Sequence, residues 1–211
     1  MERLNIYMVT NMIEHLQGDC RHVLRTLEDD LVDVCITSPT YWQTGGEGEQ
    51  LGREKSAKEY IKGLGDVFDE VKMILKDKGI LWLVLGGHIG VPFGVAFELQ
   101  RRGWILQKDI IWKGGNNHDY IFLFTKREGF YFHAPSVWNV PAVKSDIDFD
   151  VLPEDLILPM VKTCPENGLI LDCFAGSGAV GVVAKQEKKN AILIEINEKY
   201  IDLQKEKIRC S

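Results

Sequence analysis

The sequence predicts an α/β sandwich, in which helices cover both faces of a mostly parallel β-sheet. Three observations predict this fold class. Short apolar runs rich in branched side chains alternate with stretches of helical periodicity. A glycine-rich turn directly follows one of the apolar runs, and 45% of the 211 residues are hydrophobic, with no low-complexity linker or internal repeat. We therefore expect one domain over residues 1–211.

The first half of the chain contains a buried strand and an amphipathic helix. Residues 32–38 form a short apolar run that ends in a proline turn, and a polar, glycine-rich loop follows over 43–55. Ser56 and Glu59 have the spacing of a capping box. Apolar residues then recur at steps of three and four, which predicts a helix whose buried face carries Tyr60, Leu64, Phe68, Val71 and Leu75. Gly79 is expected to end that helix.

The second half alternates strands and helices. Strands are expected over residues 80–85, 104–112, 120–125, 168–172 and 191–196. Helices are expected over residues 91–102 and 153–163, and from the cap Asn197 to about residue 209. Two of the strands follow each other without a helix between them, which predicts an antiparallel hairpin at one edge of the sheet. Residues 133–152 are expected to be irregular, and Pro159 to kink its helix.

A glycine-rich turn carries the first functional signal. Gly176, Gly178 and Gly181 form a G-x-G-x-x-G pattern directly after the strand at 168–172, and Glu195 ends the next strand. Such glycines let the backbone pass close to a nucleotide, and a carboxylate after the second strand binds ribose hydroxyls. A tight strand-to-helix turn without a ligand is the alternative.

The position of this turn disfavours a dinucleotide. Only thirty residues follow Gly181, too few for the second nucleotide-binding half of a dinucleotide fold. Asp172 at the end of the strand would repel a pyrophosphate, which prefers a bare helix N-terminus, but it would accept a hydrogen bond from an ammonium group. S-adenosylmethionine carries an ammonium, a sulfonium and a ribose, and it therefore fits the pattern better.

The segment TSPTYW at residues 37–42 carries the second signal. It follows a predicted strand, at the carboxyl edge where open α/β sheets bind ligands. Pro39 stiffens the turn, its carbonyl and the Ser38 hydroxyl accept hydrogen bonds, and Tyr41 offers a stacking face. These features predict a pocket for a planar substrate. The alternative is a Ser-Pro turn whose two aromatic residues only cover a surface.

Taken together, these segments resemble a known family. The chain is similar, almost end to end, to the S-adenosylmethionine-dependent DNA amino-methyltransferases of the permuted β class, whose catalytic tetrapeptide precedes the cofactor-binding strand. The matching segments are Gly18-Asp19, TSPTYW (37–42), residues 76–87, HDYIFLFTK (118–126), residues 153–157, LDCFAGSGAVG (171–181) and IEINEKY (194–200). The resemblance implies a Rossmann-like methyltransferase fold with permuted motif order. No separate target-recognition domain is evident.

The resemblance also implies residue roles. The catalytic residues would be Ser38, Pro39, Thr40 and Tyr41, and the cofactor-binding residues Asp19, Asp172, Phe174, Ala175, Gly176, Ser177, Gly178 and Glu195. Within the second set, Asp172 and the glycine turn would hold the methionine moiety, Glu195 the ribose, and Asp19 the adenine end. Trp42 beside the tetrapeptide and the cations Arg53 and Lys55 are the candidates for substrate binding.

The implied reaction is methyl transfer to the exocyclic N4 amino group of a flipped-out cytosine in double-stranded DNA. Ser38 at the first position of the tetrapeptide favours cytosine N4 over adenine N6. The alternatives are an adenine-N6 enzyme, a non-catalytic relative that binds S-adenosylmethionine or DNA, and an enzyme acting on RNA or a protein amide. A homodimer and a cognate restriction endonuclease are open as partners, and no membrane partner is expected.

Three departures from the family pattern stand out. Thr40 replaces the second proline of the tetrapeptide, which bears on rate or specificity. Cys173, Ala179 and Val180 change the cofactor motif but leave its glycines and Asp172 in place. His88 stands where an aspartate often follows the glycine near position 87.

Charge and cysteine usage set further bounds. A net charge of −6 excludes a globally basic nucleic-acid binder, so DNA contacts must use local, salt-sensitive basic patches. The five cysteines are widely spaced without a C-x-x-C pattern, and neither a disulfide framework nor a metal site is expected. No apolar run spans a bilayer. We expect a soluble, cytoplasmic protein of prokaryotic or viral type. DNA recognition would have to use segments 43–55, 113–118 and 133–150.

Overall fold

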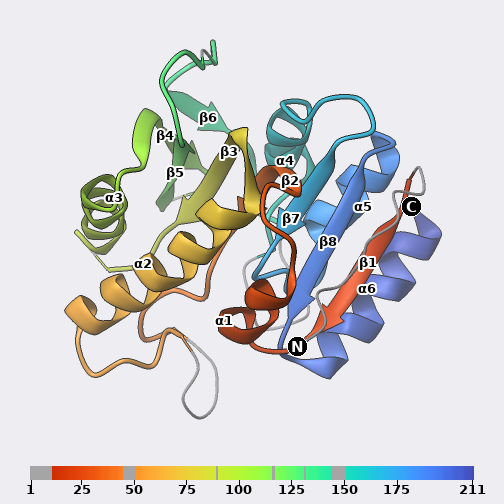
Figure 1. Cartoon of the computed structure of the whole chain (residues 1–211), viewed down its shortest axis with the longest axis horizontal. Helices are drawn as coiled ribbons and strands as arrows, with labels where there is room; N and C mark the ends of the chain where they lie inside the picture. The colour runs from red at the N-terminus through yellow and green to blue at the C-terminus, as the bar shows by residue number, and fades with distance from the viewer. Residues whose placement is uncertain (1–10, 45–50, 89, 116, 131, 144–150) are drawn as a thin grey trace.

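A computed structural model describes residues 11–44, 51–88, 90–115, 117–130, 132–143 and 151–211 (Figure 1). One sheet has the strand order β1-β8-β7-β2-β3-β5-β4-β6. Its strands are β1 (Ile13–Gln17), β2 (Val32–Thr37), β3 (Leu75–Leu85), β4 (Ile105–Lys113), β5 (His118–Thr125), β6 (Val137–Asn139), β7 (Leu169–Asp172) and β8 (Asn190–Glu195). Among these strands only β5 runs antiparallel to its neighbours. The predicted, mostly parallel sheet is confirmed.

Helices cover both faces of this sheet (Figure 1). They are α1 (Cys20–Val23), α2 (Ala57–Ile74), α3 (Val91–Arg101), α4 (Glu154–Val161), α5 (Ala179–Gln186) and α6 (Glu198–Cys210). The first three pack on one face and the last three on the other, which gives two cores separated by the sheet. Within the described ranges, no helix is both long and apolar enough to cross a membrane.

Strand β3 shows why a continuous apolar run belongs in the middle of such a sheet. Leu81 and Leu83 join the core under α1–α3, whereas Trp82 and Val84 join the core under α4–α6. Successive side chains of a strand point to opposite faces, so a strand covered on both sides needs apolar residues at every position. Trp82 is fully buried, and its indole N–H donates to the Thr163 hydroxyl at 3.1 Å.

Local capping signals place two helix starts correctly. The Ser56 hydroxyl accepts a hydrogen bond from the Glu59 amide at 3.3 Å and begins α2. The Asn197 side chain accepts from the Lys199 amide at 3.1 Å and begins α6. The second half of the predicted capping box differs, because the Glu59 carboxylate accepts from the Lys55 amide at 3.1 Å.

The expected end of the first long helix is wrong. Helix α2 ends at Ile74, and Gly79 lies inside β3. Tertiary contacts draw this segment into the sheet: Leu75 pairs with Val32 of β2, and Lys76 forms an ion pair with Asp33 at 2.8 Å. Strand pairing here overrides the local helical pattern.

Two short strands at the edges of the sheet were not predicted from the sequence. Strand β1 occupies one edge of the sheet beside β8, and β6 pairs with β4 at the other edge. The predicted hairpin of β4 and β5 is confirmed, with β6 one strand beyond it, inside the stretch that was expected to be irregular.

Helix α4 is shorter than expected, with Pro153 as its N-cap and Pro159 in its interior. Of the expected recognition segments, residues 45–50, 116 and 144–150 lie outside the described residues.

Candidate active site

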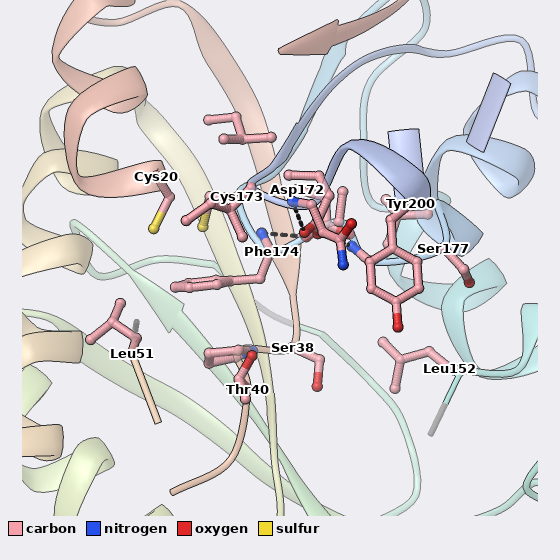
Figure 2. A pocket seen from close by; sticks show the side chains of 18 of the residues that line it. Cys20, Ser38, Thr40, Leu51, Leu152, Asp172, Cys173, Phe174, Ser177 and Tyr200 are labelled. Carbon is pink, nitrogen blue, oxygen red and sulfur yellow. Dashed lines mark hydrogen bonds between the residues drawn. The ribbon is translucent and has the colours of Figure 1, made fainter. Parts of the chain in front are cut away.

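The carboxyl ends of four neighbouring parallel strands, β1, β8, β7 and β2, surround one cavity of about 730 Å³ (Figure 2). Gly18 and Asp19 follow β1, Glu195 ends β8, and Asp172 ends β7. Ser38 directly follows β2 and also lines the cavity. The topology therefore brings together both sequence motifs, which lie more than a hundred residues apart in the chain.

Each glycine of the turn has a separate structural reason. Gly176 has φ +49° and faces open space, since a Cβ there would meet no atom within 4 Å. Gly178, the N-cap of α5, has φ +83°, and its Cβ would lie 2.7 Å from Cγ of Gln204. Gly181 packs α5 closely onto β8, where a Cβ would lie 2.6 Å from Leu193. The turn thus exposes backbone to the cavity at Gly176 and packs tightly behind it.

Asp172 lies at the bottom of the cavity, only 4% exposed. Its Oδ1 accepts hydrogen bonds from the Thr37 hydroxyl at 2.7 Å and from the Phe174 amide at 3.1 Å. Burial nevertheless raises the pKa of this carboxyl to about 7, and the nearby Glu195 carboxylate adds to the increase. A cationic group in the cavity would stabilise the ionised form.

Glu195 joins the turn to the end of β8. One carboxylate oxygen accepts from the Gly176 amide at 2.8 Å, and the other accepts from the Asn197 amide at 2.8 Å. Each oxygen has two lone pairs, so both keep capacity for a further donor, such as a hydroxyl in the cavity. These contacts hold the carboxylate at the cavity wall.

Asp19 forms the wall next to Glu195. It caps α1 by accepting from the Arg21 amide at 2.9 Å, and its carboxylate forms an ion pair with the Arg21 guanidinium at 2.5 Å. The hydrogen bond from Arg21 is the main reason that the pKa of Asp19 is lowered. The Gly18 amide donates to the Glu195 carbonyl at 2.9 Å, which fixes Asp19 beside β8.

The tetrapeptide Ser38-Pro39-Thr40-Tyr41 lines the opposite side of the cavity, where Figure 2 shows Ser38 and Thr40 across from Asp172 and Phe174. Side chains from distant elements hold it. The buried Tyr60 hydroxyl of α2 donates to the Thr40 carbonyl at 3.0 Å, and the Tyr41 hydroxyl donates to Asp119 at 3.2 Å. The following Trp42 donates its indole N–H to the Glu54 carbonyl at 3.0 Å.

Most of the sequence-predicted site residues line this cavity. They are Asp19, Ser38, Pro39, Thr40, Tyr41, Arg53, Asp172, Phe174, Ala175, Gly176, Ser177 and Glu195. Three do not. Gly178 faces Gln204 on the side of the turn away from the cavity. Trp42 packs against the core with its ring edge-on to His88, and Lys55 is exposed and does not line the cavity. Their contact with a ligand stays a prediction.

The structure adds residues that sequence reasoning missed. Trp112, Leu152, Ile196, Asn197 and Tyr200 also line the cavity. Tyr200 belongs to the IEINEKY segment, one helical turn after the Asn197 cap, and this spacing from Asn197 could have indicated it. Behind the wall, the fully buried Gln204 donates to the Gly176 carbonyl at 2.8 Å and contacts His15.

Comparison with known proteins decides the family. The model of the N6/N4 DNA methylase family matches residues 32–206. This chain belongs to the DNA methylase family. The methylase is 31% identical to the type II methyltransferase M.SmaI of Serratia marcescens, over 90% of this chain and 89% of that protein. It is 30% identical to M.Cfr9I of Citrobacter freundii, over 89% and 84% respectively. The predicted resemblance to β-class amino-methyltransferases is confirmed.

Solved structures share the fold of the methylase. The cytosine-N4-specific PvuII DNA methyltransferase superposes with a TM-score of 0.81 at 17% identity, covering 94% of this chain and 87% of that one. A putative DNA modification methylase of Thermus thermophilus, solved with S-adenosylmethionine, superposes with a TM-score of 0.77 at 22% identity, covering 94% and 95%.

S-adenosylmethionine is the methylase's cofactor, and the cavity suits it chemically. A buried carboxylate matches an ammonium group, a glycine turn leaves backbone open, and a second carboxylate with spare lone pairs matches ribose hydroxyls. The methylase is thus an S-adenosylmethionine-dependent DNA amino-methyltransferase, and the cavity at the carboxyl edge of its sheet is the candidate site for that cofactor.

Proposed function

We propose that the methylase transfers a methyl group from S-adenosylmethionine to the N4 amino group of a flipped-out cytosine in double-stranded DNA. The observation that carries this proposal is that one cavity is lined both by Ser38 and Pro39 and by the two carboxylates, Asp172 and Glu195, that suit the cofactor. The serine at the first position of the tetrapeptide and the likeness to a cytosine-N4-specific fold neighbour support N4 as the acceptor.

The cofactor would be held by residues already described. Asp172 would accept from the ammonium group, Glu195 would accept from the ribose hydroxyls, and Asp19 would face the adenine end. When bound, S-adenosylmethionine supplies an electrophilic methyl group, whose bond to sulfur breaks with the electron pair staying on sulfur. The glycine turn would hold the methionine moiety through its exposed backbone.

The tetrapeptide prepares the nucleophile. The lone pair of an exocyclic amino group is delocalised into the ring, so the group attacks poorly. The Ser38 hydroxyl oxygen and the Pro39 carbonyl would accept hydrogen bonds from the two N–H groups of this amino group. These hydrogen bonds favour a more tetrahedral nitrogen with an available lone pair. One of these protons is released to water after transfer. Tyr41 would stack on the base and align it, so positioning supplies most of the rate enhancement.

Direct methyl transfer of this kind needs no cysteine nucleophile. The four thiols of Cys20, Cys35, Cys164 and Cys173 are buried. Burial raises the pKa of Cys20 and Cys173 well above the ordinary range and that of Cys164 to about 12. These three thiols therefore stay protonated at neutral pH, whereas a nucleophilic cysteine needs the thiolate.

Incubation with isotope-labelled S-adenosylmethionine and unmethylated bacterial genomic DNA, followed by mass spectrometry of the nucleosides, tests the proposal. We expect N4-methylcytosine, and its loss in Ser38→Ala and Tyr41→Ala. N6-methyladenine as the product would overturn the choice of base. Cofactor binding with no methylated nucleoside, or labelling of RNA or protein instead, would overturn the proposed reaction. A homodimer and a cognate endonuclease stay predictions.

A further inference from the structure

One hydrogen bond between two segments that are far apart in the sequence fixes the aromatic ring of Tyr41. The Tyr41 hydroxyl donates to Oδ2 of Asp119 at 3.2 Å. Asp119 lies at the start of β5, directly before Tyr120, which pairs with Leu85 at the end of β3. The sheet therefore places this carboxylate at the level where β3 ends, seventy-eight residues from Tyr41 in the chain.

Two glycines make room for this pair. A Cβ on Gly86 would lie 1.9 Å from Oδ1 of Asp119 and 2.6 Å from Cε2 of Tyr41. A Cβ on Gly87, which has φ +89°, would lie 3.3 Å from Cβ of Tyr41. The tyrosine ring and the carboxylate therefore both rest on a stretch of backbone that carries no side chain.

This arrangement restricts the ring at both ends. The backbone of the tetrapeptide is held through the Thr40 carbonyl by Tyr60, at 3.0 Å. The far end of the ring is held by Asp119, and the Gly86–Gly87 backbone supports the ring between these points. A tyrosine side chain has two rotatable bonds, so fixing its hydroxyl while its backbone is held leaves the plane of the ring little freedom.

We propose that Asp119 is a positioning residue, which sets the plane of Tyr41 and through it the orientation of the target base. The inference rests on the proposed function, because it matters only if a base stacks on Tyr41. It assigns Asp119 no contact with the base or the cofactor. Removing the Asp119 carboxylate should lower kcat and leave the dissociation constant for the cofactor unchanged, since misalignment of the reacting groups slows the chemical step.

The test is a double-mutant cycle of Asp119→Ala and Tyr41→Phe, read as kcat for methylation of unmethylated genomic DNA. We expect each single variant to lose about tenfold in kcat with an unchanged dissociation constant for S-adenosylmethionine, and the double variant to lose no more than either single one. Asp119→Asn keeps an acceptor oxygen and should stay within about threefold of wild type. Asp109→Ala, on the neighbouring strand β4 with an exposed carboxylate, is the matched control.

Several outcomes would overturn the inference. Losses that multiply in the double variant would show that the two residues act independently, and wild-type turnover in Asp119→Ala would show that the carboxylate does not matter. If Asp119→Ala fails to fold, Tyr41→Phe alone decides, because it removes the hydrogen bond and keeps the ring, and wild-type kcat there overturns the proposal. A wild-type protein that yields no methylated nucleoside overturns the proposed function itself, which is a separate result.

Discussion

The Thr37 hydroxyl donates a hydrogen bond to Oδ1 of Asp172 at 2.7 Å, and both residues are buried. Thr37 ends β2 and is followed directly by the tetrapeptide, whereas Asp172 ends β7 in the cofactor motif. The two halves of the site are therefore joined by a hydrogen bond between adjacent strands. This bond favours the charged form of Asp172, but burial outweighs it and raises the pKa to about 7.

The raised pKa of Asp172 predicts pH-dependent cofactor binding. An ammonium group pairs with the ionised carboxylate, and that form becomes scarcer as the pH falls through about 7. We expect the affinity for S-adenosylmethionine to exceed that of Asp172→Asn by a factor that grows between about pH 6 and pH 8. Isothermal titration calorimetry at several pH values measures this ratio, and a constant ratio would contradict the expectation.

The same group predicts how the stability of the ligand-free protein varies with pH. A carboxyl whose pKa rises from 3.8 in the unfolded chain to about 7 in the fold contributes stability below about pH 4, and this contribution is lost as the pH rises through 7. Asp172→Asn, which stays neutral, should therefore stabilise the free protein relative to wild type more at about pH 8 than at about pH 5. Urea denaturation at both pH values checks the sign, and the reverse order would contradict it.

The hydrogen bond from Tyr60 to the tetrapeptide predicts that a change in α2 affects catalysis. Tyr60→Phe keeps the buried ring but leaves the Thr40 carbonyl without the hydroxyl donor that lies 3.0 Å away. We expect a loss of about 1 kcal/mol in the free energy of unfolding, together with a severalfold lower kcat because the tetrapeptide loses a fixed point. Urea denaturation and methylation assays measure both. Thr40→Ala, which keeps the carbonyl, should have the free energy of unfolding of the wild type. Equal destabilisation by the two variants would argue against the Tyr60–Thr40 hydrogen bond as the cause.

The glycines of the cofactor turn predict two different kinds of defect. Gly178→Ala would force a positive φ on alanine and push into the buried Gln204, so we expect at least about 1 kcal/mol of lost stability. Gly176→Ala also places alanine at a positive φ, of +49°, but its methyl group meets no atom within 4 Å and would project toward open space at the cavity. Its larger effect should be on cofactor affinity. Calorimetry and denaturation of both variants would separate the defects, and the opposite ranking would contradict this assignment.

Arg53 predicts a salt-dependent contact with DNA. It is exposed and lines the cavity mouth in a protein with a net charge of −6. Arg53→Ala should weaken DNA binding and lower the slope of log affinity against log salt by about one unit, as expected for one lost phosphate contact. Fluorescence anisotropy with a DNA duplex measures the slope. Lys78→Ala, at the amino-end segment of β3, is the control, and an equal change there would show only a general charge effect.

Local patterns in the chain were sufficient for many elements. The helix caps at Ser56 and Asn197 depend on hydrogen bonds that span two or three residues, and both formed as predicted. The buried strands β2, β7 and β8 were recognisable because a strand covered on both faces is apolar throughout. Edge strands lack this signal, and β1 and β6 were missed for that reason.

Periodicity, turn chemistry and motif spacing act over short distances, so they were enough to predict the sandwich, the glycine turn and the tetrapeptide. The side chains that hold those motifs in place become apparent only in the folded chain. Tyr60, Asp119 and Gln204 reach the site from α2, β5 and α6 through hydrogen bonds that span 20, 78 and 28 residues. Such contacts form only once the sheet order has brought these elements together, so no local pattern in the chain records them.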